Sequence, residues 1–406
     1  MRKFFTGLVL FCLTLILAGP AWGQLDNRVF TASDPGKIRQ ELDGRVADTT
    51  TAQPNRQAPV QAGDVRISLY AFTFLRNDEY FNKLVDGIRL LGTQLNPQLV
   101  YYPSKSLRLE GGIFIWKDYG NPVLRQVAPT FRGTWTKGSS QFIFGTILPT
   151  LNHEYIEPLY DFKQLFLAPL EEGVQYRLTN KRVFLDVWVN WIKQEYKYSN
   201  YKEEISGGLS SRFCLTSDQR RVQVSIPFQL TARHHGGQID TARFPPVQSL
   251  FDYATGIVVR APLRGPVLEA VRLNAYGLLY DDHSYARELP YYRGHAFYLN
   301  GTLETRYLDV MLSYFQGYQF YAPLGAGYYQ SIGTSTGAIG YTIPNRKVLF
   351  VRFLRDFRVS DAAAVTVRFE PVYDFNQRNL DYSFGFYLNF RQDWLLGNLS
   401  RRERTK

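Results

Sequence analysis

The chain is poor in cysteine: Cys12 and Cys214 are the two cysteines among its 406 residues. Cys12 lies in an N-terminal apolar run that we expect to be removed, which leaves Cys214 alone in the mature chain. A single cysteine cannot form an internal disulfide and does not match any metal site built from several cysteines. We expect Cys214 to be an unpaired residue on a β-strand.

Long apolar runs are also missing beyond the N-terminal region, where no stretch reaches the roughly 18 to 20 residues of a membrane-spanning helix. The mean hydropathy is −0.25, yet aromatic residues make up 16% of the chain. A transmembrane β-barrel explains both values, because only alternate residues of each strand face lipid. A secreted β-sandwich also alternates and is the competing fold.

The N-terminus has the pattern of a secretory signal peptide, residues 1–23. Arg2 and Lys3 precede an apolar run, and Ala21-Trp22-Gly23 provides small residues before cleavage at Gln24. Loss of Arg2 and Lys3 changes the net charge from +11 to +9. A retained anchor is the alternative. Residues 24–63 are polar and predict a flexible periplasmic leader, with a small plugging role as the alternative.

From about residue 65 the chain alternates apolar and polar side chains. In one segment Val222, Val224, Ile226, Phe228 and Leu230 share one face, opposite Arg221, Gln223, Ser225, Gln229 and Thr231. This period of two is the strand period and would not keep the two faces separate on a helix. About sixteen such segments are predicted: 65–78, 96–102, 107–117, 126–136, 141–149, 172–178, 182–194, 204–215, 221–232, 250–261, 270–280, 295–306, 309–320, 347–357, 363–374 and 381–391.

The connections between these segments alternate in length. Those after even-numbered segments are mostly short, whereas 79–95, 150–171, 233–249 and 321–346 follow odd-numbered segments and are long. Outer-membrane barrels combine short periplasmic turns with long external loops, and a sandwich has no reason to sort its loops in this way. The sequence therefore predicts one all-β domain, an antiparallel up-and-down barrel over residues 64–391, with both termini periplasmic.

The last segment carries an unbroken apolar face from Tyr382 to Phe390. Within it, Ser383, Gly385, Leu388 and Phe390 resemble the C-terminal signal that the barrel assembly machinery recognises in outer-membrane proteins. In those proteins the aromatic residue usually ends the chain, whereas here residues 391–406 follow. We expect 392–406 to form a basic C-terminal tail.

On this architecture residues 65–391 resemble the uncharacterised porin-like barrels of Bacteroidota. The resemblance implies a location in the outer membrane, with membrane lipid, lipopolysaccharide and the assembly machinery as partners. In the porins that the chain resembles, the third external loop folds inward and narrows the pore. We expect loop 150–171 to do so through Glu154, Glu157 and Asp161.

Alternation also assigns a set of charged residues to the inner wall. These residues either line a water-filled pore, in which arginines are in excess, or pair with one another in a packed lumen. These predicted pore-lining residues are Arg108, Glu110, Arg132, Arg177, Asp186, Glu204, Arg212, Arg221, Arg272, Glu304, Arg306, Arg352, Asp356, Arg358, Arg368 and Glu370. The basic residues are spread along strands and form no nucleic-acid patch.

Motifs for catalysis are scarce. There is no phosphate-binding glycine loop, zinc signature or paired-carboxylate motif, and His234-His235 alone is a weak metal pattern, so we expect neither metal nor cofactor. A lipid-processing barrel would need a Ser or Thr beside a His on the wall near the membrane edge. His295 with Ser284 is the candidate, which we interpret as an ordinary loop-edge pair.

The sequence therefore predicts a channel for passive diffusion of small polar or anionic solutes, with no enzymatic activity. A closed surface-binding or structural barrel is one alternative. The other is an outer-membrane lipid-modifying enzyme, which requires a Ser–His pair within hydrogen-bonding distance on the outer wall.

Overall fold

The computed structural model describes residues 60–217, 220–237, 246–263, 265–360 and 362–402. The predicted signal peptide and most of the predicted leader lie outside these ranges. Within them, no helix is long and apolar enough to cross a membrane.

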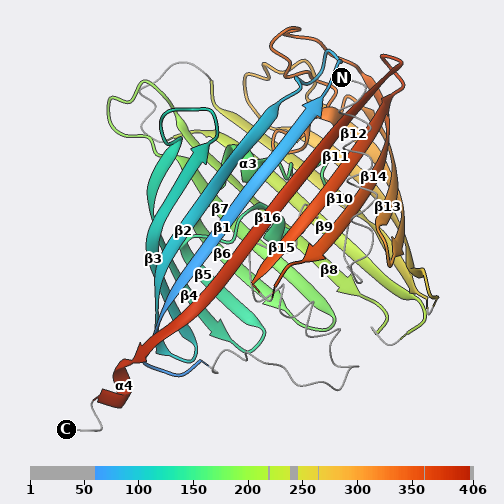
Figure 1. Cartoon of the computed structure of the whole chain (residues 1–406). Coiled ribbons are helices and arrows are strands. Elements are labelled where there is room, and N and C mark those ends of the chain that lie inside the picture. The colour runs from blue at the N-terminus through green and yellow to red at the C-terminus, as the bar shows by residue number, and fades with distance from the viewer. Residues whose placement is uncertain (1–59, 218–219, 238–245, 264, 361, 403–406) are drawn as a thin grey trace.

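The described residues form sixteen β-strands in one closed antiparallel barrel (Figure 1). Their bounds are β1 Asp64–Glu79, β2 Arg89–Ser104, β3 Leu107–Asp118, β4 Gln126–Lys137, β5 Ser140–Thr146, β6 Glu172–Thr179, β7 Val183–Lys193, β8 Glu203–Cys214, β9 Gln223–Gly236, β10 Gln248–Pro262, β11 Leu268–Asp282, β12 Arg293–Thr305, β13 Asp309–Tyr318, β14 Asn345–Arg358, β15 Ala363–Asp374 and β16 Asn379–Asn398.

Every strand pairs with its neighbours in sequence, and β1 pairs with β16 to close the barrel. Closure leaves no open sheet edge around the ring, which is how a sheet satisfies its backbone groups in lipid. The predicted fold class and strand number are confirmed. The basic tail is predicted to begin at 392, but β16 continues to Asn398 because its last residues still pair with Leu69 to Asp64 on β1.

The connections divide the barrel into two ends. We call the end that carries the connections after odd-numbered strands the loop rim, and the opposite end the turn rim. Residues 147–171 and 319–344 are the longest loop-rim connections, whereas β2 and β3 are joined at the turn rim by 105–106.

Side chains alternate across the wall as the sequence predicts. On β9, Ser225 and Gln229 face the lumen and are buried, whereas Ile226 and Phe228 are each 40% exposed on the outer face. An outward apolar band of this kind suits contact with lipid.

Two loop-rim connections fold back into the lumen, and we call residues 147–171 and 319–344 together the plug. They contain the short helices η1 Thr150–His153, α3 Gln164–Leu167 and η2 Gly327–Tyr329 (α3 is seen inside the barrel in Figure 1). The two segments bond to each other, because Ala326 N donates to Glu157 O at 3.0 Å and Asp161 N donates to Leu324 O at 2.7 Å.

Aromatic side chains attach the plug to the wall. Phe166 of α3 is fully buried against Phe72 and Phe74 of β1, and Tyr329 of η2 packs on Phe315 and Phe350. Burial of rings of this size is a large hydrophobic contribution. The lumen at the plug is therefore a packed core.

Candidate active site on the outer wall

The charged residues predicted to line a pore are mostly paired within the lumen. Glu157 of the plug bonds Arg368 at 2.8 Å and also contacts Arg352, and both arginines bond Glu370, at 2.6 Å and 2.7 Å. All four side chains are at most 5% exposed. Buried charges need such partners, because leaving one unpaired is costly.

The same pairing extends through the rest of the predicted set. Glu110 pairs with Arg108 and Arg132, Asp186 with Arg177, Arg212 with Glu154, Arg272 with Glu304, and Glu204 with Arg233. Asp356 accepts a hydrogen bond from Thr366. Asp161 lies in the plug, where its carboxylate accepts the backbone N–H of Lys163 at 2.9 Å.

Two residues do not lie where the alternation predicts. Arg221 precedes β9 and Arg306 follows β12, and both are exposed in turns at the turn rim. Their strands are shorter at this end than the period suggests, so neither side chain belongs to the inner wall. For Arg358, the structure describes the backbone alone, at the end of β14.

The predicted assembly signal divides between the two faces of β16. Ser383 and Gly385 face the lumen, whereas Leu388 is 37% exposed and lies on the outer face with Phe390. Recognition by the assembly machinery stays a prediction.

The histidines lie closer to the wall than the sequence indicates. His153 is buried in the plug beside Glu171 and Asp186, and His235 bonds Glu204. His234 was expected in a loop but belongs to β9, which extends to Gly236. Among the described residues, no group of three or more His, Cys, Asp or Glu side chains is placed to hold a metal ion.

His234 faces outward and meets a serine. It lies opposite Ser249 in the β9–β10 ladder, and its Nδ1 is 2.9 Å from Ser249 Oγ. Leu250, the next residue on β10, is buried in the lumen, so Ser249 points to the outer face. Both residues are partly exposed at the loop rim. This is the Ser–His pair on the outer wall that a lipid-processing barrel requires.

The other side of Ser249 is also polar. His283 N donates to Ser249 O at 2.9 Å, which places His283 across β10 from His234. His283 Nε2 lies 3.3 Å from Asp281 Oδ2, and its ring packs edge-on against Phe251. Ser249 thus has a histidine on each neighbouring chain segment.

Ser284 supports the backbone here. Its buried Oγ accepts the Ser249 N–H at 2.9 Å, and its own N–H donates to Asp282 at 2.7 Å. The sequence suggests Ser284 and His295 as a pair, but His295 lies opposite Leu279 and Tyr318, further along the wall from the rim. Ser284 orients Ser249 and is not the serine that contacts a histidine.

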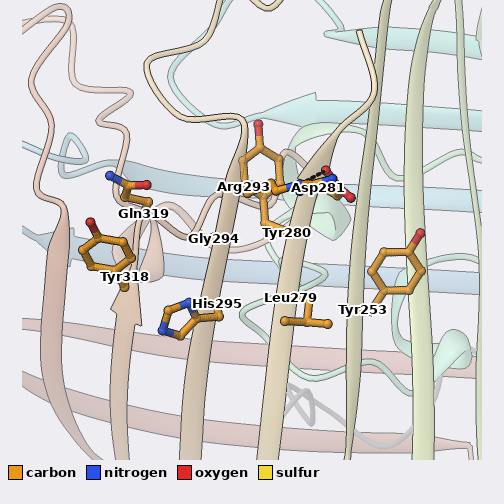
Figure 2. Close-up of a pocket in the computed structure, with 9 residues that line it drawn as sticks. All are labelled: Tyr253, Leu279, Tyr280, Asp281, Arg293, Gly294, His295, Tyr318 and Gln319. Carbon is orange, nitrogen blue, oxygen red and sulfur yellow. Dashed lines mark hydrogen bonds and ion pairs between the residues drawn. The ribbon is translucent and has the colours of Figure 1, made fainter.

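A pocket of about 420 Å³ opens on the same outer face (Figure 2). Its walls come from β10 to β13 and include Tyr253, Leu279, His295 and Tyr318. Asp281 and Arg293 form an ion pair of 3.2 Å beside it. Aromatic and apolar side chains make most of its walls, with a few polar groups among them.

A closed sixteen-stranded barrel with an apolar outer band and a Ser–His pair at its rim defines an outer-membrane β-barrel with an enzyme-like site. The family described as Lipid A 3'-O-deacylase-type matches residues 55–399. The chain therefore belongs to that family.

Solved structures of outer membrane proteins match the chain at low identity. A loop-deletion form of OmpT, an outer membrane protein of Vibrio cholerae, is 14% identical, with 82% of this chain and all of that one covered and a TM-score of 0.49. OprD of Pseudomonas aeruginosa is 10% identical over 84% of this chain and 98% of that one, with a TM-score of 0.47. No curated protein sequence gives a significant match.

The family membership corrects one prediction. From the sequence we expect a protein without enzymatic activity, but the matching family is of the deacylase type, and a deacylase is an enzyme. The signal that was missed is Ser249, which lies one residue before the predicted strand 250–261 and opposite a histidine assigned to a loop.

Proposed function

We propose that this protein hydrolyses an acyl ester of an outer-membrane lipid, with Ser249 as nucleophile and His234 as general base. The single observation that carries the proposal is the 2.9 Å contact between His234 Nδ1 and Ser249 Oγ on the lipid-facing side of the barrel. The family name supports the same reaction type and suggests lipid A as the substrate.

The chemistry follows from the contact. A neutral His234 with its proton on Nε2 accepts the Ser249 hydroxyl proton at Nδ1 while Oγ attacks the ester carbonyl carbon. The bond from that carbon to the alcohol oxygen then breaks, and the proton passes from His234 to the leaving alcohol. Water, deprotonated by His234, attacks the acyl-Ser249 ester and releases a fatty acid and the free serine.

His283 is placed to assist from the opposite side of Ser249. When protonated it carries a positive charge that Asp281 stabilises at 3.3 Å. A cation near the reacting carbonyl favours the negative charge that develops on its oxygen. We assign His283 this electrostatic role, with Asp281 as its positioning residue.

The location suits a lipid substrate. The site lies on the outer face at the loop rim, and we propose that this rim faces the cell exterior. An ester in the outer leaflet then reaches Ser249 from the membrane without entering the lumen.

The test is hydrolysis of purified lipopolysaccharide by the refolded barrel, with released fatty acids measured by mass spectrometry. We expect Ser249→Ala to abolish release and His234→Gln to reduce the rate about 10²- to 10⁴-fold, the usual contribution of a general base. His235→Gln is the matched control, because His235 is the next residue on β9 and bonds Glu204 on the lumen side. Unchanged hydrolysis in Ser249→Ala would contradict the proposal.

The diffusion channel predicted from the sequence is the competing function. The packed plug and the paired charges of the described lumen weigh against it. Conductance of the refolded protein in planar bilayers tests it: steady ion flow supports the channel, and a silent bilayer supports a sealed barrel.

A further inference from the structure

The outer-wall pocket lies where one ladder ends. The pairing of β12 with β13 stops at His295 and Tyr318, whereas the pairing of β12 with β11 continues to Arg293 opposite Asp281. Beyond Tyr318 the chain leaves this ladder, although Gln319 still lies against Gly294, and the recess that forms the pocket lies at this point. Figure 2 shows Tyr318 and Gln319 to one side of His295.

The pocket lies between the Ser–His pair and the apolar band. Along β10 the outward residues run from Ser249 through Phe251 to Tyr253, about 14 Å at the strand rise. Further toward the turn rim the outward residues are apolar and exposed, with Ile257 and Phe297 each 46% and Leu273 59% exposed. The pocket is thus continuous with the surface that contacts hydrocarbon.

At its mouth a carboxylate lies between two basic side chains. Asp281 pairs with Arg293 on one side and with His283 on the other, at 3.2 Å and 3.3 Å. The carboxylate of Asp281 would repel a phosphate placed beside it. An uncharged chain meets no such repulsion and contacts Leu279 and the rings of Tyr253 and Tyr318.

We propose that this pocket binds the acyl chain of the ester that Ser249 attacks, and so selects lipids by chain length. The proposal rests on the proposed function. The carbonyl lies at the rim beside Ser249 and His234, and the chain descends past Phe251 into the recess. Each methylene that enters the pocket is transferred from water or disordered lipid to contact with the apolar pocket wall.

The first test fills the pocket. Leu279→Trp narrows it, and Leu273→Trp is the matched control, because the two leucines share β11, the outer face and exposures of 58% and 59%. Substrates are glycolipids that differ only in acyl length. With these substrates presented as monomers in water, we expect Leu279→Trp to shift the preference to shorter chains, by up to about fourfold in rate for each methylene excluded. The control should keep the wild-type preference.

A second test does not need hydrolysis. The Ser249→Ala protein is mixed with a lipid that carries a photoreactive diazirine on its acyl chain, and the labelled peptides are mapped. We expect labels on the segments around Tyr253, Leu279 and Tyr318.

Labels spread evenly around the wall, or a chain-length preference unchanged in Leu279→Trp, would overturn the acyl-pocket proposal while leaving Ser249-dependent hydrolysis intact. A protein that captures the acyl chain but hydrolyses nothing would overturn the proposed function alone. If Arg293→Gln weakens the binding of phosphorylated lipids while Leu279→Trp leaves the chain preference unchanged, the pocket belongs to the head group.

Discussion

Polar side chains in the lumen and on the outer wall differ in burial and in their partners. The lumen holds a buried cluster of charged side chains that pair with one another, namely Glu157, Arg352, Arg368 and Glu370. These pairs hold the plug against the wall. On the outer wall, Ser249 and His234 are partly exposed and bonded as a pair. In the lumen the charged residues hold the structure together, whereas Ser249 and His234 at the rim have the geometry for chemistry.

The largest expected effect on stability comes from breaking the lumen cluster. Glu157→Gln leaves two buried arginines sharing Glu370, and loss of one partner of a buried pair typically costs about 3–5 kcal/mol. The measurement is the free energy of unfolding in lipid vesicles. The exposed pair Arg89–Glu79 provides the control, because Glu79→Gln should cost about 1 kcal/mol or less. Equal losses in the two variants would mean that the plug is not held by this cluster.

A smaller effect is expected on the outer wall below the rim. Ile226 faces outward in the apolar band of β9, so Ile226→Arg should destabilise the barrel by about 2–4 kcal/mol, the cost of a cation near the middle of the bilayer. The same unfolding measurement in vesicles checks this value. Ile226→Leu is the control and should be close to neutral. A tolerated arginine would place this stretch of β9 outside the hydrocarbon.

Much of this comparison could be predicted from the sequence. The period of two assigned the faces of β9 and β16, and the parity of connection lengths favoured a barrel over a sandwich. The acidic loop 150–171 was expected to fold inward, and the structure places Glu154 opposite Arg212 and Glu157 between Arg352 and Arg368.

The site could not be predicted, for a physical reason. Strand ends are set by the register of neighbouring strands, and His234 and Ser249 are polar residues near such ends with no periodic signal of their own. Their contact depends on pairing across a loop. Glu157 and Arg352 are separated by 195 positions, and no local pattern reports so distant a contact.

The remaining expected effect is a pH dependence of the plug. Burial alone would lower the pKa of His153, but Glu171 and Asp186 raise it to about 9. Because the pKa is raised on folding, the stabilisation is complete below the ordinary value of about 6.5 and is lost as the pH rises toward 9. Hydrogen exchange in residues 151–160, corrected for intrinsic rates, should therefore show weaker protection at pH 9 than at pH 6.

His153→Gln should remove most of this pH dependence, because a glutamine does not titrate in that range. If the variant and the wild-type protein lose protection equally between pH 6 and pH 9, another group controls the plug.

The most direct test of the central claim is chemical labelling of Ser249. A fluorophosphonate reacts with a serine whose hydroxyl is activated by a neighbouring base. Mass spectrometry of the refolded protein should find the adduct on the peptide that contains Ser249, and His234→Gln should suppress it while His235→Gln should not. A protein that hydrolyses lipid but carries no adduct on Ser249, or an adduct that persists in His234→Gln, would contradict the assignment of this pair.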